Sequence, residues 1–187
     1  MAAEDLRVRE ELARSGALFE GYHSRMRELH ERNAARLAVI MERHGWPGKS
    51  LVGEDAAKSA WLILQHAISD PSLLRRGLSL LRNAAAIGEV SLIQAAMLED
   101  RISSNEGKGQ RYGTQFDWDE HGRISPLPID DESNVDQRRA EIGLAPLAEV
   151  IARMRQLAAE SGEKPPHDWK ARQREKLEWL RSTGWLA

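Results

Sequence analysis

Histidine side chains are the groups in this chain best suited to moving protons, because imidazole titrates near neutral pH. Of the six histidines, His30 and His66 have neighbours that bear on their role. His30 stands three residues before Asn33 in a long amphipathic pattern, so the amide shares its helix face and can orient the ring. His66 follows Gln65 and the apolar stretch 60–64, which predicts that at least one of these polar side chains faces inward.

Both histidines also have a plainer interpretation. Asn33 can be a solvated surface residue, and a buried His66 can donate to a backbone carbonyl in the core. Acid/base catalysis favours a carboxylate beside the imidazole, and Glu54 is our candidate partner for His66 or for His44. The neighbouring Asp55 is better explained as a helix cap, because a new helical pattern begins there.

Metal-ligand spacing is absent from the sequence. The chain has no cysteine, and it contains no H-x-x-x-H motif. His23 and His30 are seven residues apart, which places them roughly 10 Å apart along a helix. A zinc site built from His23, His44, His66 and a carboxylate is possible only if the fold brings these distant residues together. Our leading interpretation therefore includes no metal and no other cofactor.

Aromatic and amide side chains complete the candidate site. Trp46, in the break between two helical patterns, and Trp61 can line a cleft, although tryptophan more often packs in a core. The four residues 112–115, Y-G-T-Q, offer Tyr112 and Gln115 as donors beside a glycine that permits close backbone approach. The same residues also suit a β-strand.

The elements that would position these residues are mainly helical. Amphipathic patterns with the period of an α-helix predict helices over these approximate ranges: 3–15, 17–43, 55–68, 72–87, 89–104, 135–142 and 146–159. Residues 112–127 predict one β-hairpin around the turn D-E-H-G. We expect a mainly α fold: an antiparallel bundle with this hairpin in a single domain over 1–160. Residues 161–187 should add a proline-containing linker and a C-terminal helix packed on that domain.

Composition excludes several classes of function. The 187 residues carry a formal net charge of −2, so they form no basic field for nucleic acid. The charged N-terminus does not resemble a secretory signal, and the longest apolar run is too short to cross a bilayer. P-loop, Rossmann and G-x-S-x-G motifs are absent. We expect a cytoplasmic protein that binds a small molecule or peptide, not nucleic acid or a membrane; its oligomeric state is open.

Several short motifs together carry a resemblance. They are G-Y-H followed by Met26, His30 and N-A, then H-G-W-P, S-L-V-G-E-D, W-L-I-L-Q-H-A and Y-G-T-Q. The chain resembles an uncharacterised bacterial family, catalogued as a domain of unknown function, over roughly residues 21–155. The resemblance implies a stand-alone intracellular protein and brings no activity with it. The matching residues include His23, His30, Asn33, His44, Trp46, Glu54, His66, Asp100, Tyr112 and Gln115, whereas His121 and His167 lie outside the pattern.

Our leading hypothesis is an enzyme that hydrolyses or cyclises a small or peptidic substrate by acid/base chemistry. His30, His66 and His44 would transfer protons, with Glu54 as their partner. The residues that bind and polarise the substrate would be His23, Asn33, Trp46, Trp61, Gln65, Tyr112 and Gln115. One alternative is a non-enzymatic binding module with a Trp-lined groove, and another is a metal-dependent hydrolase with His and Glu ligands. Convergence of His30, Glu54, His66 and Gln115 in space would favour the enzyme.

Overall fold

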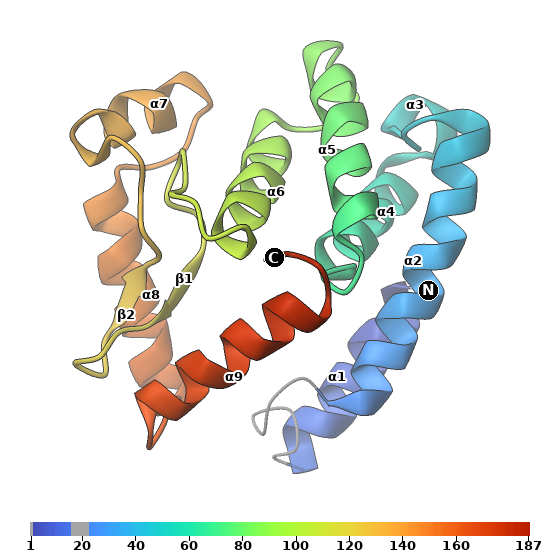
Figure 1. The fold of residues 1–187 in the computed structure, drawn as a ribbon. Helices are drawn as coiled ribbons and strands as arrows, with labels where there is room; N and C mark the ends of the chain where they lie inside the picture. Colours follow the sequence, from blue (N-terminus) through green and yellow to red (C-terminus); the bar gives the residue numbers. More distant parts are fainter. Residues whose placement is uncertain (1, 16–22) are drawn as a thin grey trace. The chain divides into compact units, whose positions relative to one another are not determined.

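The fold is mainly α, as the sequence predicts. The computed structural model describes residues 2–15 and 23–187. In these residues it is 67% helical, with nine α-helices and one two-stranded antiparallel sheet. The chain divides into two compact units, Met1–Gln94 and Ala95–Ala187 (Figure 1). The boundary between the units falls inside a helix, at a point where the sequence shows no linker.

The described part of the first unit contains α-helices joined by loops, and no β-strand. Its elements are α1 (Ala2–Ser15), α2 (Ser24–His44), α3 (Lys49–Val52), α4 (Glu54–His66) and α5 (Pro71–Ala86), and α6 (Leu92–Asn105) begins at its end. Helix α1 packs against α2 and α4, and α2 also packs against α5 (Figure 1). Helices α1, α2 and α4 thus all contact one another.

Local signals explain where these helices begin and end. Helix α2 ends at Gly45, whose φ of 71° suits glycine, and its predicted start near residue 17 lies outside the described residues. Asp70 caps α5 by accepting a hydrogen bond from the N–H of Leu73 at 2.9 Å. Residues 49–52, which lie between the predicted helical ranges 17–43 and 55–68, form the additional short helix α3.

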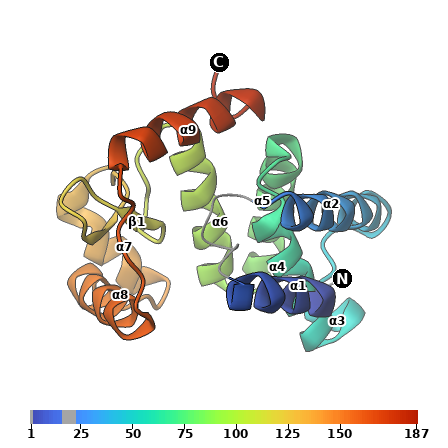
Figure 2. The same ribbon diagram turned by 90° about the horizontal axis from the view of Figure 1, so that it is seen from below.

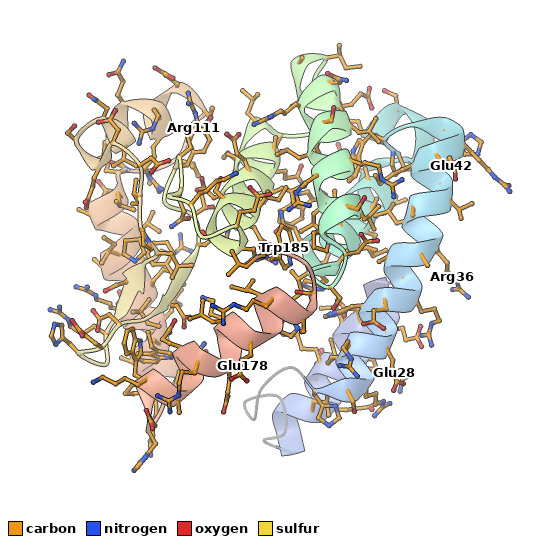
Figure 3. The ribbon with its side chains drawn as sticks, viewed as in Figure 1. Glu28, Arg36, Glu42, Arg111, Glu178 and Trp185 are labelled. Carbon is orange, nitrogen blue, oxygen red and sulfur yellow. The ribbon has the colours of Figure 1, made fainter. Side chains whose placement is uncertain are left out.

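The buried face of α1 differs from the one that its leucines suggest. Leu6 is 53% exposed, whereas Asp5, Val8 and Leu12 are buried. These three positions lie three and four residues apart, which is the spacing of one helix face. On α2 the inward face carries Met26 and Leu29 against α1's apolar residues. Figure 3 shows the opposite face of α2, from which the labelled charged side chains project: Glu28, Arg36 and Glu42.

The second unit contains the predicted β-hairpin. Strands β1 (Phe116–Trp118) and β2 (Ile124–Pro126) pair antiparallel, with Trp118 opposite Ile124. In the turn, the Asp119 carboxylate accepts from the N–H groups of His121 and Arg123, both at 2.9 Å. The pKa of this carboxyl group is lowered to about 2, and the backbone hydrogen bond from Arg123 is the largest cause.

Three further helices complete this unit. They are α7 (Val135–Glu141), preceded by the 3-10 turn η2 (Glu132–Asn134), then α8 (Leu147–Ser161) and α9 (Trp169–Ser182). Helix α8 packs against β2, and the start of α9 lies beside the hairpin (Figure 2). The indole of Trp169 donates to the carbonyl of Trp118 at 2.8 Å. Asp117 pairs with Arg172 at 2.8 Å and with Lys176 at 3.3 Å, so two ion pairs join this helix to the hairpin.

Candidate functional site

A carboxylate lies on the apolar face of α1, where folding alone does not require one. The Asp5 side chain is only 4% exposed. Because a buried ionised group costs stability unless it is paired, the carboxylate must find hydrogen-bond donors inside the protein. It finds them on two other helices of the first unit.

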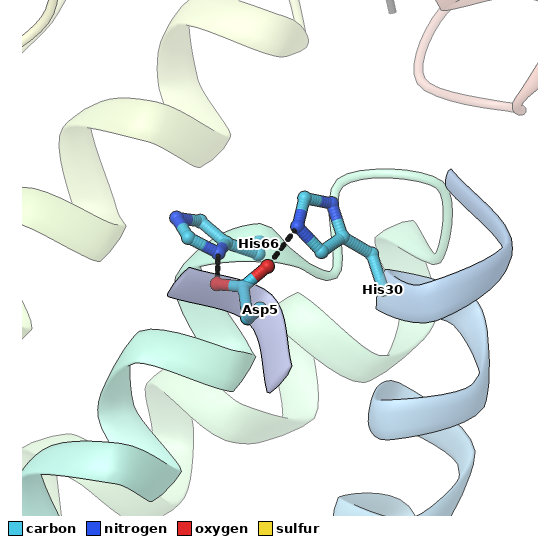
Figure 4. A group of neighbouring side chains, drawn as sticks. All are labelled: Asp5, His30 and His66. Atoms are coloured by element: carbon cyan, nitrogen blue, oxygen red, sulfur yellow. Dashed lines mark hydrogen bonds and ion pairs between the residues drawn. The ribbon is translucent and has the colours of Figure 1, made fainter. Parts of the chain in front are cut away.

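Asp5 joins His30 of α2 and His66 of α4 (Figure 4). One carboxylate oxygen, Oδ1, lies 2.8 Å from Nε2 of His30, and the other, Oδ2, lies 2.9 Å from Nδ1 of His66. The two imidazole rings are inclined by 35°, with their centroids 4.7 Å apart. We call these three side chains the His–Asp–His cluster. Residues far apart in the sequence thus meet at one point.

The contacts decide which ring nitrogens carry hydrogen. An ionised carboxylate can only accept hydrogen bonds, so Nε2 of His30 and Nδ1 of His66 are the N–H donors. In a neutral imidazole the opposite nitrogen then holds a lone pair. The proton-accepting atoms are therefore Nδ1 of His30 and Nε2 of His66. A carboxylate that fixes an imidazole in this way sets the tautomer that a general base needs.

A small pocket opens beside the cluster. Its volume is about 170 Å³, and it is lined by His30, Glu31, Ala34, Ala35, His66, Ala67, Ser69 and Asp70. Three of the lining residues are alanines, and both imidazole side chains belong to the lining. The hydroxyl of Ser69, one of the lining residues, is buried and has no hydrogen-bond partner among the described residues. Both imidazoles can therefore face a bound molecule.

Of the catalytic residues predicted from the sequence, His30 and His66 come together. Glu54 does not join them: its side chain is 75% exposed and lies 3.6 Å from Lys58 on its own helix. His44 is exposed at the end of α2. We predicted Glu54 as the carboxylate partner of the histidines, but Asp5 occupies that position. Glu54 does not converge with His30 and His66.

The predicted substrate-binding residues of the first unit lie in several environments. Asn33 is buried, and its Oδ1 has no hydrogen-bond partner among the described residues. The ring of His23 caps α2 by accepting from the N–H of Arg25 at 3.2 Å. Trp46 and Gln65 are buried, and half-buried Trp61 donates to a backbone carbonyl at 3.3 Å. None of these five belongs to the described lining of the pocket.

Tyr112 and Gln115 belong to a buried network in the second unit. Fully buried Asp100 accepts from the backbone N–H groups of Arg111, Tyr112 and Thr114 and from the Thr114 hydroxyl, at 2.8 to 3.0 Å. The side chain of Gln115 accepts from Arg101 at 3.1 Å and donates to the Met97 carbonyl at 3.3 Å. These hydrogen bonds fix the loop that carries the Y-G-T-Q residues against α6, which is a structural role.

Comparison with known proteins adds a family. A family model described as a family of unknown function matches residues 3–161 of the chain. The chain belongs to this family, DUF6624. The resemblance seen in the short motifs is thereby confirmed, and the matched region begins early enough to include Asp5. No curated protein and no solved structure matches the chain.

Sequence reasoning missed Asp5, although a signal was present. Counting back from Leu12 by four and then three residues leads through Val8 to Asp5. An acidic residue in phase with an apolar helix face is unusual, because it must be buried or interrupt the face. Asp5 also precedes the motifs at residues 21–155, so nothing in them pointed to it.

The described helices give no indication of a membrane span. None of them combines the length and the apolar character that crossing a bilayer requires.

Proposed function

We propose that this protein is an enzyme that performs general acid/base chemistry on a small substrate, by hydrolysis or cyclisation. The observation that supports the proposal is the buried Asp5 carboxylate, which contacts one nitrogen of His30 and one of His66 beside an open pocket. Folding does not require this arrangement, because three apolar side chains of similar volume at these positions would pack without the free-energy cost of burying a carboxylate.

Each side chain has a distinct role in this proposal. Asp5 orients both rings and stabilises the positive charge that forms when either ring takes a proton. One imidazole removes a proton from the nucleophile and becomes an imidazolium. The other begins the cycle protonated on both nitrogens and gives the proton that does not face Asp5 to the leaving group. In hydrolysis the nucleophile is water, and in cyclisation it belongs to the substrate. Correctly placed proton transfer of this kind contributes roughly 10²–10⁴-fold to a rate.

The size of the pocket limits the substrate. Its volume of about 170 Å³ lies below the roughly 300–1,000 Å³ of pockets that enclose drug-sized ligands. A small metabolite fits, as does one side chain of a longer peptide. The Trp-lined groove has less support, because Trp46 is buried and the half-buried Trp61 is bonded to a backbone carbonyl.

Conservative variants test the proposal without disturbing the cluster. Glutamine places an N–H where His30 has Nε2, and asparagine places one where His66 has Nδ1, so His30→Gln and His66→Asn retain the donors to Asp5. Neither side chain can accept and release a proton. A panel of small chromogenic esters, amides and amino acid anilides identifies a substrate for the wild-type chain.

Both variants should then lose about 10²-fold or more of kcat while their far-UV circular dichroism spectra stay native. His121→Gln is the matched control, because the His121 side chain is 65% exposed and lies in the hairpin turn. Turnover within twofold of wild type in both cluster variants would contradict the proposal.

A further inference from the structure

The three atoms that meet in the His–Asp–His cluster are all ligands that divalent transition metals accept. One carboxylate oxygen of Asp5, one nitrogen of His30 and one nitrogen of His66 lie within 4.8 Å of one another. The shortest nitrogen–oxygen separations involve different oxygens: 2.8 Å from His30 to Oδ1 and 2.9 Å from His66 to Oδ2. Two imidazoles and one carboxylate make up a common three-residue ligand set for catalytic metals.

We infer that Asp5, His30 and His66 bind one divalent first-row transition metal ion, in place of the two hydrogens that the carboxylate now shares with the rings. Metal–ligand bonds of roughly 2.0–2.2 Å separate neighbouring ligand atoms by about 3.0 Å at right angles and about 3.4 Å in a tetrahedron. If the carboxylate binds the ion through both of its oxygens, small outward shifts of the rings from their present separations of 2.8 and 2.9 Å meet these values.

The ligand set favours some ions over others. Imidazole nitrogen suits Zn²⁺, Co²⁺, Fe²⁺ and Ni²⁺, whereas Mg²⁺ and Ca²⁺ prefer oxygen ligands. Three protein ligands leave at least one coordination position for water or substrate. His30 and His66, two of the three ligands, line the neighbouring pocket.

The inference concerns the same site as the proposed function and rests on that proposal. It adds that a bound metal ion would regulate the proposed activity. The metal would take Nε2 of His30 and Nδ1 of His66, the atoms that now face Asp5. Each neutral ring must then carry its hydrogen on the opposite nitrogen, which no longer accepts a proton. A bound ion therefore switches off the proposed bases, and the metal-free and metal-loaded states exclude each other.

Zinc titration of the purified full-length chain tests the inference. The metal-free protein competes with a chromophoric chelator for Zn²⁺, and Co²⁺ absorption spectra independently show whether nitrogen and oxygen ligands surround the ion. We expect one equivalent of Zn²⁺ to bind to the wild type and to the control His121→Gln. Asp5→Asn, His30→Gln and His66→Asn should each weaken binding beyond the roughly 10–100-fold loss caused by removing an outer-shell partner.

Folding of each variant is checked by circular dichroism, and the two histidine variants decide the outcome if Asp5→Asn does not fold. Absence of saturable binding to the wild type would overturn the inference, as would wild-type affinity in both histidine variants.

Activity separates this inference from the proposed function. Turnover by metal-free protein that Zn²⁺ inhibits supports both. Turnover without any zinc binding leaves the acid/base proposal intact and refutes the metal site. Turnover that requires the ion supports the metal site and refutes metal-free catalysis.

Discussion

Replacing Asp100 of α6 with asparagine should strongly destabilise the second unit. Asp100 is completely buried, and its two oxygens accept hydrogen bonds from Arg111, Tyr112 and Thr114. Asparagine has nearly the same shape, so the substitution creates no cavity. It changes one acceptor oxygen into a donor that faces another donor.

The magnitude follows from the contacts. A single amide oxygen cannot serve donors that now use two, so at least one buried N–H loses its acceptor at a cost of about 1–3 kcal/mol. The two bonds that remain lose their charge assistance, which is worth about 1 kcal/mol each. The total, about 3–5 kcal/mol, is a large part of the roughly 5–15 kcal/mol that stabilises an ordinary domain.

Hydrogen exchange and urea unfolding measure this effect. The amide protons of Arg111, Tyr112 and Thr114 should exchange faster in Asp100→Asn, and the free energy of unfolding should fall by the amount above. Asp136→Asn is the control, because exposed Asp136 accepts a single backbone hydrogen bond, from Leu147 at 2.7 Å. Equal losses in the two variants, or unchanged protection of the three amides, would refute the reasoning.

Three further predictions concern packing, titration and docking. A Cβ on Gly77 would lie 2.6 Å from a methyl of fully buried Leu64, so Gly77→Ala should lower the free energy of unfolding by about 1 kcal/mol or more. In a Leu64→Ala background the same change should be stabilising, because helix propensity alone remains; destabilisation in both backgrounds would contradict this steric explanation. The Asp119 carboxyl should titrate by NMR with a pKa of about 2, because the N–H of Arg123 stabilises its charged form. Its contribution to stability is present above the ordinary pKa of 3.8 and is lost as the pH falls towards 2; a midpoint near 3.8 would rule out these turn contacts. Asp117→Asn removes the partner of two basic side chains on α9 and should cost about 1 kcal/mol in urea unfolding, with faster amide exchange along that helix; unchanged exchange would show that apolar contacts dock it.

Much of the helical architecture could be predicted because local signals were strong. Helix α2 has a regular apolar period and the stop signal at Gly45, and the start of α5 has a capping aspartate followed by proline. The four-residue helix α3 has no room for a period, so its residues were indistinguishable from a loop. The division into two units falls within α6, where the helical pattern continues without a break.

The site was only half predictable, because periodicity identifies a helix face but not the contacts between helices. His30 and His66 were singled out as polar residues on apolar faces, and both belong to the cluster. Their carboxylate comes from α1, and only the packing of α1 against α2 and α4 brings it within reach. The Y-G-T-Q residues show the converse: donors that suit a ligand equally suit a buried carboxylate, here that of Asp100.

The claim that Asp5 unites two imidazoles into one site is tested most directly by the ring nitrogens themselves. Long-range ¹H–¹⁵N spectra of the wild type should show hydrogen on Nε2 of His30 and on Nδ1 of His66, the atoms 2.8 and 2.9 Å from the carboxylate. In Asp5→Asn both rings should change their nitrogen shifts together, while exposed His121 keeps its own. A change in only one ring, or in neither, would contradict the account.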